Sequence, residues 1–250
     1  MLEPGSTSMV LLETNPLGAE VWPAGTVINE PMYYGNTDII VLGNLLINGG
    51  SLELENSRLV VFSSTTRSVY LSAGELVLVN SSLSSLGTAR LLEPARVQIV
   101  AEADSPVYIA DSSLRWTTEF IVKSSLSEIH NLSVTHASIS GIKIIFCSPR
   151  LSGLNLDWTP IGLNLNGDSS KISDVHVTNA REYAVYAAQS YSTIDNMKVD
   201  NSSSGLYSYN GMMAISNAEM QDCSIAIYPY YSLMELASMN ITGSGTGIYA

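Results

Sequence analysis

Three aspartates have the spacing expected of acid–base chemistry. Asp157 and Asp200 occupy the same position of a repeat of about 21 residues, and Asp222 lies one position further on in its own copy. Glycoside hydrolysis requires a pair of carboxylates. Two repeats correspond to about 10 Å along a stack of strands, near the upper limit for an inverting pair. The competing interpretation is that each Asp hydrogen-bonds local backbone amides at a turn.

Six tyrosines form a second pattern in the C-terminal part of the chain. Four follow one another at intervals of 21 residues and two more lie two residues after members of the first set: Tyr186, Tyr207, Tyr228 and Tyr249, then Tyr209 and Tyr230. If these positions point outward, they form an exposed aromatic stripe. Tyr offers a flat apolar face and a hydroxyl, which suit sugar rings or a protein partner. The alternative is that the rings stack on one another and stabilise a sheet.

Histidines and cysteines show no such alignment. His130, His136 and His176 have different offsets within the repeat, so they share no face, and we expect no metal site or cofactor. Cys147 and Cys223 lie four repeats apart, about 19 Å in a strand stack, whereas a disulfide needs Cα atoms within about 7 Å. They are predicted to be free, buried thiols.

Composition narrows the classes of partner. With 11 Lys and Arg against 23 Asp and Glu, the net charge of −12 disfavours nucleic acid and anionic membranes. No apolar run approaches the roughly 18 residues that span a bilayer. Four N-x-[ST] sequons would suit a secreted chain: Asn80, Asn131, Asn201 and Asn240. In a sequence rich in Asn and Ser, such matches also arise by chance.

These residues are positioned by a nine-fold repeat of the form aliphatic–x–Asn/Asp–x–x–aliphatic. Its copies start at intervals of 24, 31, 20, 22, 21, 22, 21 and 21 residues: Leu54, Leu78, Ile109, Ile129, Leu151, Ile172, Ile194, Ile215 and Leu236. The third position reads Asn56, Asn80, Asp111, Asn131, Gly153, Asp174, Asn196, Asn217 and Ser238. Most of these residue types tolerate a left-handed backbone or bond locally in tight turns.

A second series runs in phase with the first. A small residue precedes an aliphatic one at regular intervals: Gly141-Ile142, Gly162-Leu163, Ala184-Val185, Gly205-Leu206, Ala226-Ile227 and Gly247-Ile248. One coil of about 21 residues cannot bury its own apolar face, but stacked coils build a continuous core and pair their backbones. Helical repeats need longer units, and a β-sandwich gives no columns at constant offset. The sequence therefore predicts an all-β, right-handed parallel β-helix of about nine coils.

The ends of this repeat set the expected domain limits. Residues 1–37 contain four prolines and are predicted to form an irregular or strand-like cap, with the β-helix over 38–250. The long interval after Leu78 predicts a protruding loop around Ser85 to Ala95, carrying Arg90 and Glu93. The chain ends within a repeat, and open β-helix ends expose unpaired backbone. We therefore expect it to be truncated, with end-to-end stacking or stacking on the remainder of a longer protein.

The repeats resemble a known superfamily. Gly205-Leu206-Tyr207, Ile215 to Met220 and Ile227-Tyr228 look like the parallel β-helix repeats of the pectin-lyase-like superfamily. The run Gly43 to Ser57 is similar to the first coils of large archaeal and bacterial cell-surface β-helix proteins. The resemblance covers about residues 38–250 and implies the fold, but the superfamily includes enzymes, adhesins and surface-layer proteins. The Asp-Asp, Gly-His-Gly and Arg-Ile-Lys motifs of its polygalacturonase-type hydrolases are absent.

Two functions remain open at this point. The first is a non-catalytic extracellular or cell-surface module, structural or adhesive, with a glycan or protein partner on the tyrosines. It involves no nucleic acid and no membrane insertion by this segment. The second is a polysaccharide lyase or glycoside hydrolase that uses Asp157, Asp200 or Asp222. A periplasmic metal-delivery protein resembling copper-maturation proteins is a third option, which the unaligned histidines count against.

Overall fold

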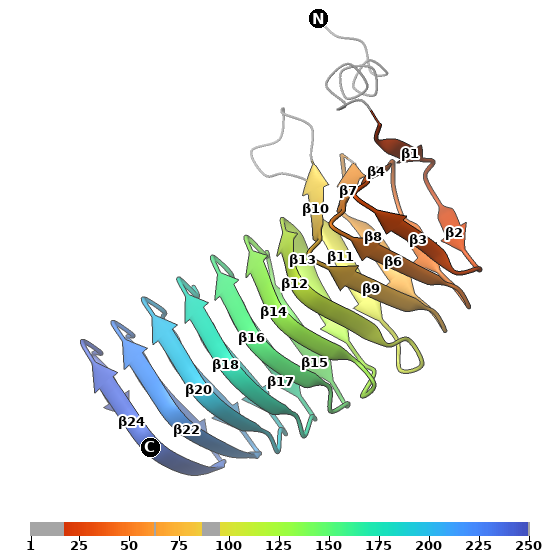
Figure 1. Ribbon diagram of the computed structural model, residues 1–250. Helices are drawn as coiled ribbons and strands as arrows, with labels where there is room; N and C mark the ends of the chain where they lie inside the picture. Colours follow the sequence, from red (N-terminus) through yellow and green to blue (C-terminus); the bar gives the residue numbers. More distant parts are fainter. Residues whose placement is uncertain (1–17, 63, 87–95, 250) are drawn as a thin grey trace, which may run out of the picture.

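The structure is a computed structural model that describes residues 18–62, 64–86 and 96–249. All regular elements in this part of the chain are strands, and no helix there is long and apolar enough to cross a membrane. The strands form two parallel sheets, of 14 and 11 strands, which run along an elongated stack (Figure 1). Each turn of the chain adds a strand to both sheets, so the architecture is the predicted parallel β-helix.

The 11-stranded sheet contains one strand from each coil. In stacking order its members are β2 (Thr26–Ile28), β5 (Leu45–Ile47), β8 (Arg67–Leu71), β11 (Val97–Ala101), β13 (Thr117–Val122), β15 (Ser140–Ile145), β17 (Ile161–Asn166), β19 (Tyr183–Ala188), β21 (Ser204–Tyr209), β23 (Ile225–Tyr230) and β25 (Thr246–Ile248). This sheet bears the tyrosines on its outer side in the last coils.

The 14-stranded sheet starts as two parallel rows of short strands. One row is β1 (Glu20–Trp22), β4 (Asp38–Val41), β7 (Arg58–Phe62) and β10 (Ser82–Leu86); the other is β3 (Met32–Gly35), β6 (Ser51–Glu55) and β9 (Glu75–Val79). Both rows pair with one long strand, β12 (Val107–Arg115). Long strands then continue the stack as β14 (Glu128–Thr135), β16 (Arg150–Asp157), β18 (Lys171–Thr178), β20 (Thr193–Asp200), β22 (Met212–Gln221) and β24 (Leu233–Thr242).

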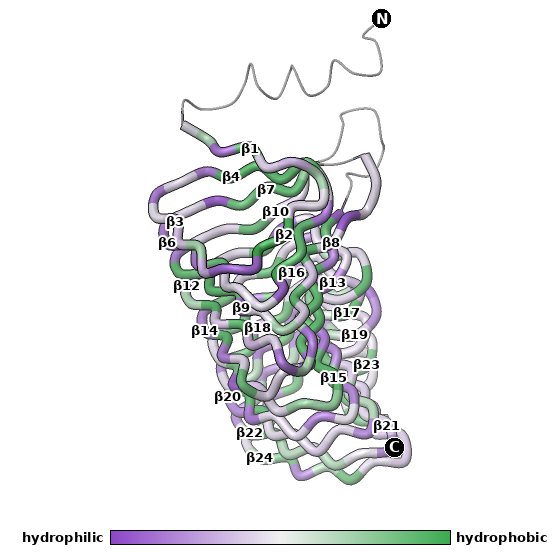
Figure 2. Tube along the Cα trace, turned by 90° about the vertical axis from the view of Figure 1, so that its right-hand side faces the viewer, coloured by the Kyte–Doolittle hydropathy of each residue, from purple (hydrophilic) through white to green (hydrophobic). Residues whose placement is uncertain are grey.

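The repeat positions lie directly over one another. Ile172 is the register partner of Leu151 on one side and of Ile194 on the other. Eight of the nine first-position side chains are at most 3% exposed, and Leu236 in the last strand of this column is half-buried. The second series, in which a small residue precedes an aliphatic one, is stacked in the same way, since Leu163 pairs with Ile142 and Val185. Hydrophobic and hydrophilic residues accordingly alternate along the coils (Figure 2). The predicted columns are confirmed as the core.

The third position of the repeat makes the corner of each coil. All nine residues there have φ between 46° and 64°, the left-handed region that Asn, Asp and Gly enter most easily. At Gly153 an added Cβ would lie 2.2 Å from Oδ1 of Asn131 in the preceding coil. The sequence therefore predicted both the place of the corner and its backbone conformation.

The pairing starts earlier than the sequence indicated. β1, β2 and β3 fall within the segment expected to form a cap, and they pair in parallel with β4, β5 and β6. Within the described residues the stack of paired strands therefore starts at Glu20, and the part of the expected cap from Glu20 onward is strand-like and joins the β-helix. These strands have only three or four residues each, too few to display the full repeat. The predicted loop with Arg90 and Glu93 lies outside the described residues.

Both cysteines are buried and free, as predicted. Burial raises the pKa of the Cys147 thiol to about 11 and also raises the pKa of Cys223. Both thiols are therefore protonated at neutral pH and behave as small apolar side chains.

Candidate functional site

The tyrosines form a continuous ladder of rings across four neighbouring strands. Tyr186 stacks on Tyr207 with ring centroids 5.3 Å apart and an interplanar angle of 9°. Tyr228 meets Tyr207 at 5.3 Å and Tyr249 at 5.0 Å, both nearly perpendicular. The registers of β19, β21 and β23 set these neighbours, because Tyr186, Tyr207 and Tyr228 are direct partners.

A second, parallel row widens this surface. Tyr209 and Tyr230 stack with centroids 5.8 Å apart and an interplanar angle of 19°. The structure adds two tyrosines that the sequence pattern did not include. Tyr183 lies 5.4 Å from Tyr186 and 5.2 Å from Tyr207, and Tyr231 lies 4.4 Å from Tyr230. The tyrosine face is defined here as these rings: Tyr183, Tyr186, Tyr207, Tyr209, Tyr228, Tyr230, Tyr231 and Tyr249.

The tyrosine face combines self-packing with exposure. Tyr186, Tyr207 and Tyr228 are half-buried by one another, whereas Tyr209 and Tyr230 are 39% and 40% exposed. Burial, together with the neighbouring phenols, raises the pKa of Tyr207. The hydrogen bond with Tyr231 is the main cause of the raised pKa of Tyr230. Tyr207 and Tyr230 therefore present neutral hydroxyls at neutral pH.

This face carries no charge of its own. None of the strands β19, β21, β23 and β25 contains a Lys, Arg, Asp or Glu. The chain as a whole has a net charge of −12. A neutral aromatic surface in such an acidic protein can contact an uncharged ligand without removing a charged group from water.

The candidate carboxylates lie on the other sheet. Asp157, Thr178 and Asp200 are successive partners in one outward column, as the spacing predicted. Oδ1 of Asp157 accepts hydrogen bonds from Oγ1 of Thr178 at 2.6 Å and Nδ2 of Asn179 at 2.8 Å. Thus Asp157 joins two coils through side chains, whereas the competing interpretation expected bonds to local backbone amides.

Asp222 sits at a corner instead of in that column. Its φ is 52°, and Gln221 takes the outward position beside Asp200. Gly243 follows Asp222 in the next coil, and a Cβ there would lie 2.1 Å from Oδ1 of Asp222. The structure thus brings Asp157 and Asp200 onto one column and leaves Asp222 outside it.

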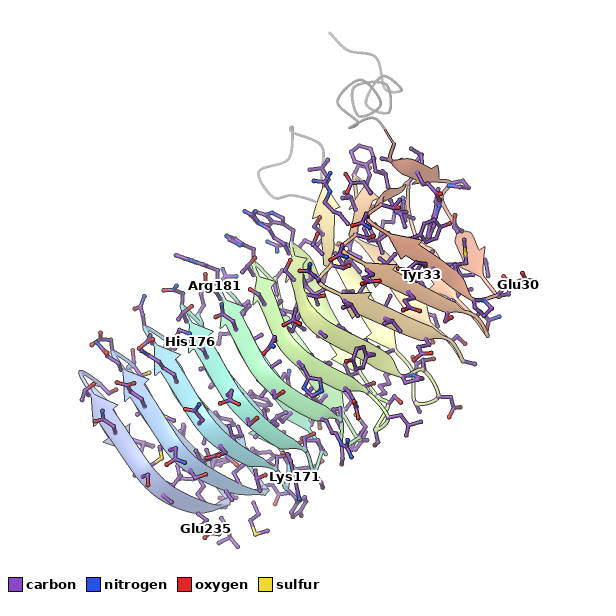
Figure 3. All side chains as sticks on the ribbon, in the orientation of Figure 1. Glu30, Tyr33, Lys171, His176, Arg181 and Glu235 are labelled. Carbon is purple, nitrogen blue, oxygen red and sulfur yellow. The ribbon has the colours of Figure 1, made fainter. Side chains whose placement is uncertain are left out.

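One contact in this region was missed from the sequence. Nε2 of His176 lies 3.0 Å from Oδ2 of Asp200, and Nζ of Lys198 lies 3.7 Å from the same oxygen. His176 and Lys198 are neighbours in one outward column, two positions before that of Asp200, on the outer side of the sheet (Figure 3). Comparing outward columns across adjacent coils, instead of histidine offsets alone, would have revealed the pair.

The other histidines lie apart from this pair. Nδ1 of His130 is 2.6 Å from Oγ of Ser152, and the ring of His136 packs on Trp116 with centroids 4.4 Å apart. Within the described ranges, no group of three or more His, Cys, Asp or Glu side chains is arranged to hold a metal ion.

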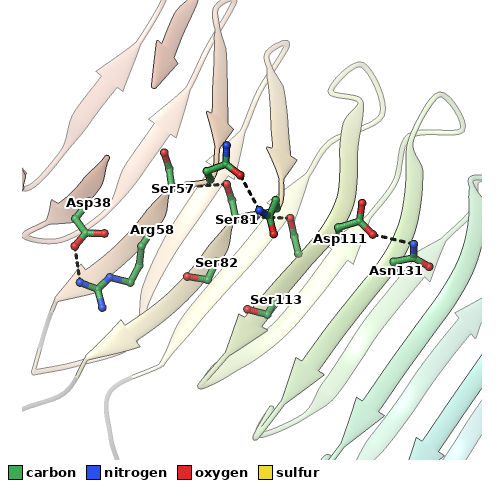
Figure 4. Close-up of a pocket in the computed structure, with 11 residues that line it drawn as sticks. Asp38, Ser57, Arg58, Ser81, Ser82, Asp111, Ser113 and Asn131 are labelled. Atoms are coloured by element: carbon green, nitrogen blue, oxygen red, sulfur yellow. Dashed lines mark hydrogen bonds and ion pairs between the residues drawn. The ribbon is translucent and has the colours of Figure 1, made fainter. Parts of the chain in front are cut away.

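A polar groove follows the asparagine corner of the first coils. Nδ2 of Asn80 donates to Oδ1 of Asn56 at 2.7 Å, and Nδ2 of Asn131 donates to Oδ1 of Asp111 at 2.9 Å (Figure 4). At another corner, Nδ2 of Asn201 donates to Oδ1 of Asn179 in the preceding coil. Three of the four sequon asparagines are therefore corner residues whose amides already bond between coils.

The N-terminal corner also contains the tripeptide Asn36-Thr37-Asp38. Its sequence equals the Asn-Thr-Asp motif of polygalacturonase-type hydrolases. Asp38 forms an ion pair with Arg58 at 2.6 Å, and Asn36 has a corner φ of 54°. The ion pair and the corner conformation give this tripeptide a structural role in the first coils.

Comparison with known proteins supports the fold. Residues 161–250 match the family model described as a right handed beta helix region. This match covers the last coils, and together with the parallel stacking of the strands it supports a right-handed parallel β-helix fold. No curated protein sequence matches the chain.

Solved structures show a distant likeness. The periplasmic alginate epimerase AlgG is 9% identical, with a TM-score of 0.41 over 88% of this chain and 76% of AlgG. The Streptococcus pneumoniae surface protein and adhesin PfbA is 10% identical, with a TM-score of 0.41 over 97% of this chain and 93% of PfbA. The pentapeptide repeat protein HetL from Nostoc sp. strain PCC 7120 is 7% identical, with a TM-score of 0.28 over 98% and 94%.

Proposed function

We propose that this β-helix is a non-catalytic binding module of a cell surface or another extracytoplasmic compartment, and that the tyrosine face binds a neutral glycan. The supporting observation is the ladder of partly exposed rings on strands without charged residues. Tyr rings supply a rigid apolar surface for the faces of sugar rings, and their hydroxyls supply hydrogen bonds. Because the two rows run along the stack, the surface suits an extended chain of sugars.

Binding to neutral polysaccharides tests this proposal. The variants Tyr207→Ala and Tyr228→Ala are expected to raise the Kd about tenfold each, as for the loss of about 1.4 kcal/mol. Tyr108→Ala is the matched control, because Tyr108 is 39% exposed, like Tyr209, but lies on the other sheet. Isothermal titration against a panel of soluble neutral glycans measures the effect. Equal affinity for the wild type and both variants would exclude the tyrosine face as the glycan site.

The location outside the cytoplasm is a separate part of the proposal. It draws on the similarity of the first repeats to those of prokaryotic cell-surface proteins. Surface biotinylation of intact cells that produce the full-length protein tests it. Labelling only after rupture of the cytoplasmic membrane, with no protein in the surface or periplasmic fractions, would place the protein in the cytoplasm and remove this part.

The His176–Asp200 pair favours a second candidate, a polysaccharide lyase or glycoside hydrolase. A histidine at 3.0 Å from a carboxylate can transfer a proton while the carboxylate orients the ring. Product release from a polysaccharide panel, abolished by Asp200→Asn, would support this function. Asp195→Asn is the control, since Asp195 lies on the same strand but bonds to Ser216 and Asn217.

A further inference from the structure

A row of ring side chains occupies the corner that follows β12, β14 and β16. Trp116, His136 and Trp158 have φ values of 57°, 59° and 52°. In the next two coils the same corner is made by Asn179 and Asn201, with φ of 55° and 49°. A large ring is not required for this backbone, because asparagine adopts it more readily. The aromatic residues therefore add side-chain surface that the fold does not need.

Two guanidinium groups gather around the first of these rings. The Cζ atoms of Arg96 and Arg115 lie 5.7 and 5.5 Å from the centroid of Trp116. Arg96 is also held by the backbone, since its Nη1 donates to the carbonyl oxygen of His136. The face of Trp116 is thus covered by cationic side chains, an arrangement that cation–π attraction favours.

Trp158 and Arg181 extend this surface by a further coil. Trp158 is 55% exposed, and it lines one shallow groove with Arg181. Asn201 and Asp222 lie in the same groove. Arg181 projects at the edge where the strands of this sheet end (Figure 3). We call the whole surface the tryptophan–arginine edge: Arg96, Arg115, Trp116, His136, Trp158 and Arg181.

Two arginines of this edge, Arg115 and Arg181, differ from most other basic residues of this acidic protein in their ion pairing. Within the described residues, Arg115 and Arg181 form no ion pair, whereas Arg58, Lys123, Lys143, Arg150 and Lys198 all do. The nearby carboxylate of Asp157 accepts hydrogen bonds from Thr178 and Asn179. These arginines are therefore available to a carboxylate from outside the chain.

We propose that the tryptophan–arginine edge is a docking surface for an acidic polypeptide. Trp and Arg are the residues most enriched at the energetic centres of protein interfaces. Guanidinium groups bind Asp and Glu side chains through paired hydrogen bonds. The exposed indole of Trp158 offers the apolar contact next to these charges. The surface lies at the corner that leads into the 11-stranded sheet, and Arg181 at its end is two residues before Tyr183 of the tyrosine face.

Fluorescence-detected binding of poly-L-glutamate to the full chain tests this inference. At low ionic strength, poly-L-glutamate is expected to bind and to change the tryptophan emission, and added salt weakens the binding. Arg115→Gln and Arg181→Gln are expected to raise the Kd about fivefold each, and Trp158→Asn about tenfold. Asparagine is chosen for Trp158 because Asn179 and Asn201 adopt the same positive φ at this corner in the next two coils. Lys171→Gln is the control for charge, because Lys171 also lacks an ion pair among the described residues but begins β18.

Three results would overturn the inference. The first is no binding of poly-L-glutamate by the folded wild-type protein at low salt. The second is an equal loss of affinity in Lys171→Gln, which would mean general charge attraction. The third is preferential binding of dextran sulfate over poly-L-glutamate, abolished by Trp158→Asn, which would make the edge a site for anionic glycans. Circular dichroism of each variant verifies that the fold is retained.

Discussion

The first coils and the later coils build the same corner in two different ways. In the first coils, the residue after the corner is a buried serine, as at Ser57, Ser81 and Ser112. The backbone N–H of Ser57 donates to Oγ of Ser81, and that of Ser81 donates to Oγ of Ser112, both at 3.0 Å. In the later coils this column becomes apolar, and Leu154 pairs with Val175 within continuous strands.

This difference explains why one sheet begins as two rows of strands. Where serine hydroxyls accept the backbone N–H groups, the strand-to-strand ladder is interrupted at the corner, and β6 and β7 are separate. Where the next coil has an apolar residue at this position, the ladder resumes at once. Ser112 pairs with Leu132, so β12 already runs through the corner, as β16 does. Buried backbone groups are satisfied in both regions, but only the later coils add a column to the apolar core.

The outer surfaces differ between the same two regions. Around β11 and β13, Nζ of Lys123 lies 2.8 Å from Glu102, to which Tyr70 also donates a hydrogen bond at 3.0 Å. In the last coils, tyrosine rings replace such charged groups. On the side of the 11-stranded sheet, neighbouring coils are thus joined by ion pairs in one region and by stacked rings in the other.

Truncating the apolar column should have the largest effect. Leu154 is 1% exposed, and Leu154→Ala is expected to lower the free energy of unfolding by about 2–5 kcal/mol through the cavity left behind. Urea denaturation monitored by circular dichroism measures this change. Leu126→Ala is the control, because Leu126 is 76% exposed. A similar loss in both variants would show that the column contributes no special packing.

Removing one hydroxyl from the serine column should have an intermediate effect. Ser81→Ala leaves the buried N–H of Ser57 without its acceptor, at an expected cost of about 1–3 kcal/mol. The same denaturation experiment applies, with Ser82→Ala at a neighbouring outward position as control. Unchanged stability of Ser81→Ala would mean that the serine column is dispensable and that the two kinds of corner are interchangeable.

Loss of a ring from the tyrosine face should cost less. Tyr207 contacts Tyr183, Tyr186 and Tyr228, and Tyr207→Ala is expected to lower the free energy of unfolding by about 1 kcal/mol. Thermal and urea unfolding measure it, against Tyr108→Ala on the other sheet. If Tyr207→Ala unfolds like the wild type, ring stacking does not stabilise the sheet, which would favour a binding role for the tyrosine face.

The ion pair on the outer surface should have the smallest effect. Lys123→Gln is expected to cost at most about 1 kcal/mol, since both partners are partly exposed. Lys123 is the main cause of the lowered pKa of Glu102. Its stabilisation is therefore present above the unfolded-state pKa of Glu, about 4.3, and is lost as the pH falls below it. Unfolding measured from pH 3 to 7 should show a smaller acid dependence in Lys123→Gln, whereas Lys171→Gln keeps that of the wild type.

The sequence predicts the features that recur in every coil. It does not predict contacts between side chains of different outward columns. The corner residues and the inward columns were predictable because one conformation and one core impose the same residue types in every coil. The His176–Asp200 contact was not, because outward positions vary freely and their meeting depends on side-chain reach. The segment with β1 to β3 was expected to be irregular or strand-like, but its pairing into the stack was not predicted, because each strand is too short to show the pattern. Trp116 and Trp158 occupy a corner beyond the end of the six-residue repeat.

Each residue lies directly over its counterpart in the next coil, so the molecule can be lengthened by whole coils. Inserting a copy of one whole repeat, such as the 21 residues 207–227, would shift everything after it by a single strand spacing, about 4.8 Å, without turning any side chain to another face. Such a copy contains Tyr207 and Tyr209 and lengthens each of the two rows of tyrosine rings by one ring, while the tryptophan–arginine edge keeps its composition. The length of the molecule along its axis and the residues on its outer surfaces can therefore change separately in evolution.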